Sequence, residues 1–172
     1  MTAFQTDDYY NVIPEHAIEA LQSDAKLGTG GALAITTWEQ EPRENLNDYN
    51  ENELPAVAVT CDLSVVAEAT PGTDRRTYML TLWGVTTGAR LQEATKEVKA
   101  YAARIERVMM QQHDSSKQLR NVTADLLEAE SGTVVVTSES TAFDGGTEAG
   151  NLRGMAIMTF GVSIDFIITI DS

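Results

Sequence analysis

The longest regular alternation of apolar and polar positions lies near the C-terminal end of the chain. Apolar residues occupy every even position from Ala156 to Ile170, whereas most odd positions are small or polar. A period of two predicts a strand with one buried face, about three times longer than the usual five or six residues. The preceding segment 143–151 (FDGGTEAGN) is rich in turn-forming residues. We therefore expect it to be the end of a hairpin that projects into solvent.

A second alternation begins at Ala56. Val, Cys and Leu alternate with small or polar residues over 56–65, and the segment 75–85 follows after the turn signal ATPGTD. This pattern predicts two antiparallel strands joined as a hairpin. The apolar segment 32–38 (ALAITTW) predicts a further strand. Residues 119–128, which alternate, and residues 133–137, which are β-branched, predict two more.

Two segments have the spacing of an amphipathic helix. Residues 14–26 place apolar residues on one side, with Pro14 in the first turn, where proline is tolerated. Residues 91–112 carry a longer apolar stripe, and Thr86 or Thr87 can supply the helix cap. Three residues separate Gly84 from Gly88, and Ala-Arg follows, whereas a Walker phosphate loop needs four residues and then Lys-Ser or Lys-Thr. This segment therefore predicts a joint between strand and helix.

Together these elements predict an α+β fold: a mixed, mostly antiparallel sheet covered by one long and one short helix, with a long projecting C-terminal hairpin over 131–170. We expect residues 1–172 to form a single domain, since this length buries most of its apolar surface. Residues 1–12 are expected to form a polar N-terminal arm. Residues 39–55 contain six acidic residues against one arginine, which predicts a long acidic loop.

Composition narrows the classes of partner. The chain carries 12 basic and 26 acidic residues, a net charge of −14, which argues against binding nucleic acid through its phosphates. The chain has no apolar run of the roughly 20 residues that a membrane span needs, and we expect no membrane partner. The N-terminus has no secretory signal pattern, and the single cysteine fits synthesis in a reducing compartment.

The residues that most often carry chemistry do not form a recognisable site. Cys61 lies in the apolar row of a strand, which favours a small core residue over a nucleophile. His16 has no histidine or cysteine at metal-ligand spacing, and the consecutive His113, Asp114 and Ser115 cannot converge as a triad. We therefore predict no catalytic residues, no cofactor and no metal, and no enzymatic activity.

The order of elements resembles the tail terminator (tail completion) proteins of long-tailed bacteriophages. The resemblance rests on the short N-terminal helix, on LPAVAV opening a strand after an acidic loop, on YMLTLWGVTTGARLQEATKEVKAYAARIERVM as strand, turn and long helix, and on the long final hairpin. It covers roughly residues 14–170. The acidic loop 39–55 and the N-terminal arm depart from the family pattern.

The resemblance implies a virion structural protein that assembles in the host cytoplasm as a homohexameric ring. Such a ring caps the tail tube at its head-proximal end, and so contacts the tail tube protein on one face and the head connector or stopper on the other. Six copies of −14 give −84 formal charges, so DNA would pass through the lumen without specific binding. The projecting hairpin supplies the candidate partner-binding residues, which are Asp144, Glu148, Asn151, Leu152, Arg153, Met155 and Ile157.

Three alternatives to this function stay open. The first is another head-to-tail joining or tail-tube protein, since these share acidic composition and projecting β-hairpins. The second is a small acidic enzyme, which would require Cys61, His16, His113 and several carboxylates to converge in space. The third is a module that interacts with a host protein.

Overall fold

The computed structural model describes residues 5–45, 48–112, 118–148 and 151–167. In these residues two α-helices, α1 (Tyr9–Gln22) and α2 (Leu91–Met110), accompany a five-stranded sheet of order β1-β2-β3-β5-β4. The strands are β1 (Thr37–Glu39), β2 (Ala56–Thr70), β3 (Thr73–Thr87), β4 (Val135–Glu148) and β5 (Asn151–Ile167). β1 pairs with β2 in parallel and all other neighbours are antiparallel, which confirms the predicted α+β class.

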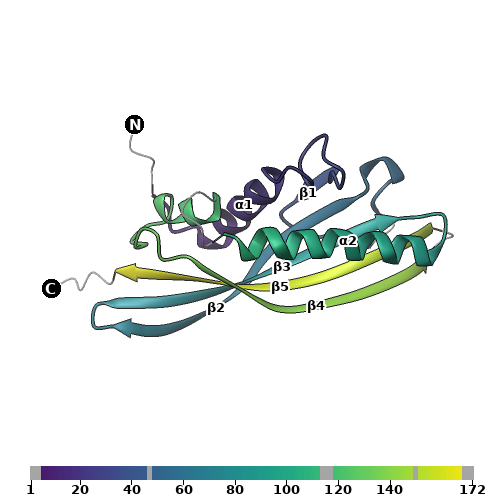
Figure 1. Cartoon of the computed structure of the whole chain (residues 1–172). Coiled ribbons are helices and arrows are strands. Elements are labelled where there is room, and N and C mark those ends of the chain that lie inside the picture. The colour runs from purple at the N-terminus through teal and green to yellow at the C-terminus, as the bar shows by residue number, and fades with distance from the viewer. Residues whose placement is uncertain (1–4, 46–47, 113–117, 149–150, 168–172) are drawn as a thin grey trace.

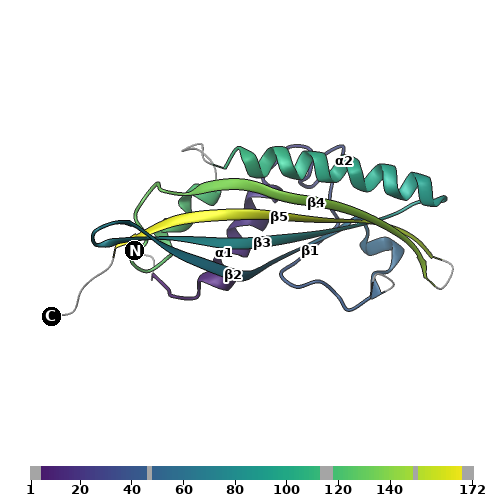
Figure 2. The same ribbon diagram turned by 90° about the horizontal axis from the view of Figure 1, so that it is seen from below.

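Both helices lie on the same face of the sheet (Figure 1). Seen from below, α1 lies behind β2 and β3, and α2 runs along β4 and β5 (Figure 2). The even positions of β5 from Ala156 to Phe166 are all buried, as the alternation predicted. This apolar face is covered by the chain's own helices.

The long C-terminal hairpin is confirmed, with 14 residues in β4 and 17 in β5. The segment 143–148, expected to be a loop, belongs to β4 instead, and Glu148 pairs with Asn151 across the turn. Glycine and acidic residues have low strand propensity, but pairing with β5 along the whole edge supplies their backbone hydrogen bonds. Only residues 149 and 150 separate the two strands.

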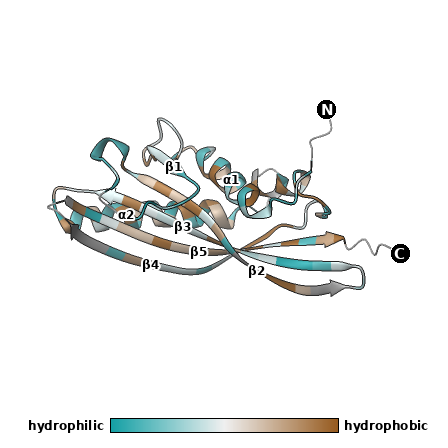
Figure 3. Ribbon diagram, turned by 180° about the vertical axis from the view of Figure 1, so that it is seen from behind, coloured by the Kyte–Doolittle hydropathy of each residue, from teal (hydrophilic) through white to brown (hydrophobic). Residues whose placement is uncertain are grey.

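A second long hairpin, β2–β3, extends past the helices at the opposite end of the sheet (Figure 1). Its turn contains Gly72 at φ 84°, a left-handed conformation that glycine adopts without strain. Val65 and Val66 are more than half exposed there. Figure 3 shows a hydrophobic segment on β2 beside hydrophilic residues on β3. The sequence pattern placed this hairpin correctly but ended its first strand at residue 65 instead of Thr70.

Two predictions about the N-terminal arm and residues 119–128 are wrong. Residues 119–128 are not a strand, because η3 (Gln118–Ala124) is a 3-10 helix. Leu119, Val122 and Leu126 are all fully buried, and their spacing of three and four is helical. The polar arm is also shorter than expected, because α1 begins at Tyr9 and Pro14 lies inside it, buried against the core.

The start of α2 packs tightly against the sheet. The first helical residue is Leu91, and Arg90 occupies the cap position without a side-chain cap bond, so the predicted threonine cap is wrong. The buried Thr86 hydroxyl instead donates to the Ala94 carbonyl at 2.8 Å. A Cβ at Gly154 would lie 2.3 Å from the same carbonyl oxygen. Glycine at this position therefore allows α2 to approach β5 closely. The prediction that this segment joins a strand to a helix is confirmed, because β3 ends at Thr87 and α2 begins at Leu91.

Candidate partner-binding surface

The outer face of the sheet, which is the side turned away from α1 and α2, brings together residues of three strands. Met155 pairs with Val85 on β3 and with Asp144 on β4, and Ile157 pairs with Trp83 two residues further along. Side chains of paired residues point to the same side, so these five share the outer face. Asp144 is exposed, and Trp83, Met155 and Ile157 are partly exposed. Three predicted partner-binding residues thus lie in one continuous surface.

Arg153 is placed differently from the other candidates. It is 2% exposed, with Nη1 donating to the Thr87 hydroxyl at 2.9 Å and Nη2 to the Tyr49 carbonyl at 3.3 Å. The guanidinium therefore fastens the acidic loop to β5 within the chain and is not available to a partner, so its assignment as a partner-binding residue is corrected. Leu152 is partly exposed, and its carbonyl accepts a bond from the Thr87 hydroxyl. Glu148 and Asn151 form the last pair of the hairpin.

The acidic loop 39–55 is organised by its one arginine. Arg43 donates to Glu39 at 2.8 Å, to both carboxylate oxygens of Glu53 at 3.0 Å and to the Asp48 carbonyl at 2.6 Å. Its guanidinium also lies over the Tyr49 ring, 4.3 Å from the centroid. These contacts hold the described part of the loop in one arrangement, which the acidic composition alone did not indicate.

The surroundings of two loop residues, Glu53 and Tyr49, shift their pKa values. Hydrogen bonds from Arg43 lower the pKa of Glu53 to about 2, so its carboxylate is charged at neutral pH. Burial raises the pKa of Tyr49 to about 12, and the bond from its hydroxyl to Glu39 at 2.9 Å acts in the same direction. Tyr49 packs with Leu54, Ala56 and Val85, so the loop is seated on the outer face of the sheet.

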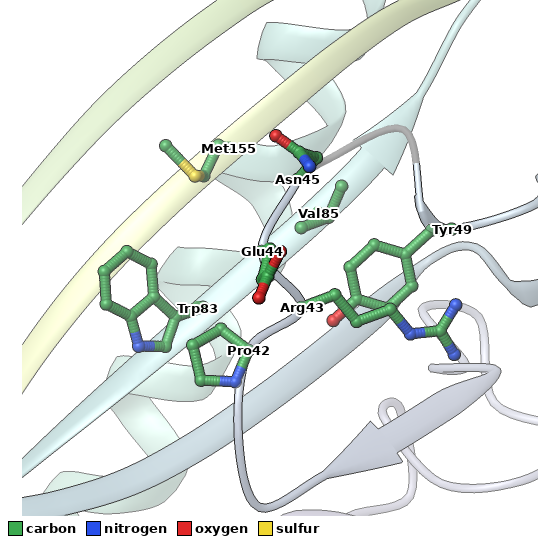
Figure 4. Close-up of a pocket in the computed structure, with 8 residues that line it drawn as sticks. All are labelled: Pro42, Arg43, Glu44, Asn45, Tyr49, Trp83, Val85 and Met155. Atoms are coloured by element: carbon green, nitrogen blue, oxygen red, sulfur yellow. The ribbon is translucent and has the colours of Figure 1, made fainter.

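A pocket of about 340 Å³ opens between this loop and the strands. Figure 4 shows the segment from Pro42 to Asn45 passing over the sheet, with Trp83 and Met155 on one side and Tyr49 on the other. A second pocket of about 400 Å³ shares Pro42 and Trp83 and continues toward the start of α1. We call the two together the Trp83 groove. The lining residues are Tyr10, Asn11, Gln40, Glu41, Pro42, Arg43, Glu44, Asn45, Tyr49, Thr60, Cys61, Asp62, Trp83, Val85 and Met155.

The residues considered for chemistry are not assembled into a reactive site. Burial raises the pKa of Cys61 to about 12, which keeps its thiol protonated, as expected of a core cysteine. His16 Nε2 lies 2.7 Å from the Asp125 carboxylate, a contact between α1 and the segment after η3 that sequence spacing did not reveal. Within the described residues, no three His, Cys, Asp or Glu side chains are grouped to hold a metal ion. His113, Asp114 and Ser115 lie outside the described residues.

Sequence reasoning missed Trp83 and the loop residues that complete this surface. Trp83 occupies an odd position of β3, in a row that holds threonine at 77, 81 and 87 but also Met79 and Val85. A large aromatic residue on the polar side of a half-buried strand is a usable signal of a binding surface. The contribution of Pro42 and Tyr49 could not be found in this way, because it depends on how the loop folds back.

The chain matches no protein-family model and no curated protein sequence. Among solved structures, it aligns with a chain of the "Virion of native gene transfer agent (GTA) particle" at 13% sequence identity and a TM-score of 0.43. The alignment covers 87% of this chain and 91% of that one. A likeness this weak assigns no function. In the described part of the chain, none of the helices is both long and apolar enough to cross a membrane.

Proposed function

We propose that this protein is a non-enzymatic structural component of a virion, a tail terminator whose subunits form a ring at the head-proximal end of the tail tube. The observation that carries the proposal is the outer face of the sheet, where Trp83, Met155 and Ile157 remain partly exposed beside the hairpin end. We propose the tail terminator family because the order of the helices and strands resembles that of its members. An apolar and aromatic surface with a polar surround is typical of a protein-binding surface.

The partners of the ring follow from the same proposal. One ring face would contact the tail tube protein and the other the head connector or stopper, with Asp144, Glu148, Asn151, Leu152, Met155 and Ile157 as the candidate contact residues. Six subunits would carry −84 formal charges in total. An acidic lumen repels the phosphates of DNA, which favours passage without binding.

Electron microscopy of the purified protein tests the oligomeric part of this proposal. We expect closed sixfold rings with a central channel. Stacked tubes would favour a tail-tube protein instead, and compact monomers would refute both assembly roles. Added to preformed tail tubes, the rings should bind one end of each tube and stop its elongation, whereas tubes that keep growing would refute the capping function.

A pair of matched substitutions tests the contact surface. Ile157→Lys places a charge among the partly exposed apolar residues of the outer face, and we expect it to weaken tube capping by at least about tenfold. Val135→Lys is the control, because Val135 is exposed on the same face but pairs with Ser163 near the other end of β5. Equal capping by both variants would remove this surface from the proposal.

A further inference from the structure

The basic residues of this acidic chain are concentrated in one segment. Residues 90–120 contain seven of the twelve basic residues and only four acidic ones, a net charge of +3. The rest of the chain therefore carries −17. A charge asymmetry of this size on one subunit allows two different surfaces of the same protein to attract each other.

The outward stripe of α2 presents two of these basic residues, Lys96 and Arg107. Lys96, Ala100, Ala103 and Arg107 follow one another at spacings of three and four, and all four are exposed. This is the side of the helix opposite the buried Ile105. Lys96 and Arg107 form no ion pair with any carboxylate that the structure describes. Ala100 and Ala103 lie between these two cations and present only small side chains on this side of the helix.

Other basic residues of the helix are engaged within the chain. Arg104 donates two hydrogen bonds to the Asp24 carboxylate and thereby ties α2 to the end of α1. The Lys99 ammonium lies over the Phe143 ring, 5.4 Å from its centroid. Lys96 and Arg107 in the outward stripe are thus the basic residues of α2 that form no described ion pair or cation–π contact.

The Trp83 groove offers the opposite charge on the opposite side of the sheet. Glu41, Glu44 and Asp62 line it, all three are exposed, and none forms an ion pair with a described basic group. Arg43 also lines the groove, but Glu39 and Glu53 already match its charge. The Trp83 ring lines both pockets, and the alkyl stem of a lysine or arginine can pack over such a ring while its cation stacks on it.

We propose that the outward stripe of α2 in one copy docks into the Trp83 groove of the next copy. Lys96 and Arg107 would pair with the groove carboxylates, and the alanines let the helix approach closely. Because the two surfaces lie on opposite sides of the sheet, the contact is heterologous. A subunit that has bound one neighbour through its helix stripe can still bind a second neighbour through its groove. Such contacts build a closed ring or an open filament. The inference deepens the proposed function by naming its subunit contact, and depends on it only for ring closure.

Charge reversal tests the contact in the full-length protein. Lys96→Glu/Arg107→Glu (helix-reversed) and Glu41→Lys/Glu44→Lys (groove-reversed) should each raise the dissociation constant of self-association at least about tenfold, measured by analytical ultracentrifugation. Single Lys96→Glu is compared with Lys26→Glu, which makes the same change at an exposed lysine outside the stripe and should leave association unchanged. Circular dichroism confirms that every variant is folded.

Mixing the two reversed variants provides the decisive readout. The acidic helix of the first then faces the basic groove of the second, and the basic helix of the second faces the acidic groove of the first. We expect assembly to return in the equimolar mixture and in neither variant alone. Association of the parent protein should also weaken between roughly 0.05 M and 0.5 M NaCl, because these exposed charges are screened.

The outcomes separate this contact from the proposed function. Rings that survive both reversals, or a parent protein that stays monomeric at all salt concentrations, overturn the contact. Charge-dependent filaments or tubes, restored by mixing, establish the contact while refuting the terminator ring. A helix reversal that leaves self-association intact and abolishes binding to duplex DNA would assign the basic stripe to nucleic acid and also overturn the contact.

Discussion

Gly154→Ala is the substitution for which the structure gives the sharpest expectation. A Cβ at this position would lie 2.3 Å from the Ala94 carbonyl oxygen and 2.8 Å from the Thr86 hydroxyl oxygen. A carbon and an oxygen normally approach no closer than about 3.3 Å, so the start of α2 must retreat by about 1 Å. The atom in the way is backbone, which a rotamer change cannot move aside.

Three terms set the size of the effect. Overpacking of this kind costs about 1–3 kcal/mol. The retreat also breaks the buried bond from Thr86 to Ala94, which costs about another 1–3 kcal/mol because both groups lose their partner. Replacing glycine by alanine restricts the unfolded chain and returns about 0.4–1 kcal/mol. We expect a net loss of about 2–5 kcal/mol in the free energy of unfolding.

Gly84→Ala is the matched control. Gly84 also lies in a strand on the buried face, but its Cβ would meet its nearest neighbour, a Val98 methyl group, at 3.8 Å, an ordinary contact. Urea unfolding followed by circular dichroism should therefore show Gly84→Ala equal to or slightly more stable than the parent. In thermal unfolding, Gly154→Ala should melt roughly 4–20 °C lower. Equal stability of the two variants would refute the close approach of α2 to β5.

Three further predictions concern the core, the loop and the cysteine. Ile105→Asp should lower the free energy of unfolding, measured in urea, by about 3–5 kcal/mol, because it buries an unpaired carboxylate. Glu106→Asp at the next, exposed position is the control and should lower it by less than about 1 kcal/mol. Equal losses would show that this side of α2 is not in the core. Arg43→Ala should lower the urea midpoint at pH 7. Because the pKa of Glu53 is about 2 when folded and 4.5 ordinarily, this deficit should be constant above pH 4.5 and shrink as pH falls toward 2, and a deficit that grows with acid would contradict the pairing. Cys61 should react with iodoacetamide at pH 8.5 about 100-fold or more slowly in the folded protein than in urea, because its folded pKa is about 12, and equal rates would show an accessible thiolate.

The sequence by itself determined the elements whose pattern is set by burial against a core. The even positions of β5 from Ala156 to Phe166 and the apolar stripe of α2 from Ala94 to Met109 are buried as predicted, whereas Leu91 at the start of the stripe is exposed. A side chain on a strand or helix can reach the core only at the period of that element. The turn at Gly72 was also readable, since few residues other than glycine adopt its backbone conformation. These features depend on backbone geometry within a short segment, and so the residues of that segment are enough to predict them.

The tertiary structure decided the features that depend on distant partners. Residues 143–148 became a strand because β5 lies beside them, although their own propensity favours a turn. Arg153 and Arg43 look alike in sequence as surface cations, yet one is buried beneath the acidic loop and the other holds that loop together. The Trp83 groove exists only where this loop folds over the sheet. Hydrogen bonds and ion pairs between residues far apart in the chain leave no period in the sequence, and so only the folded chain reveals them.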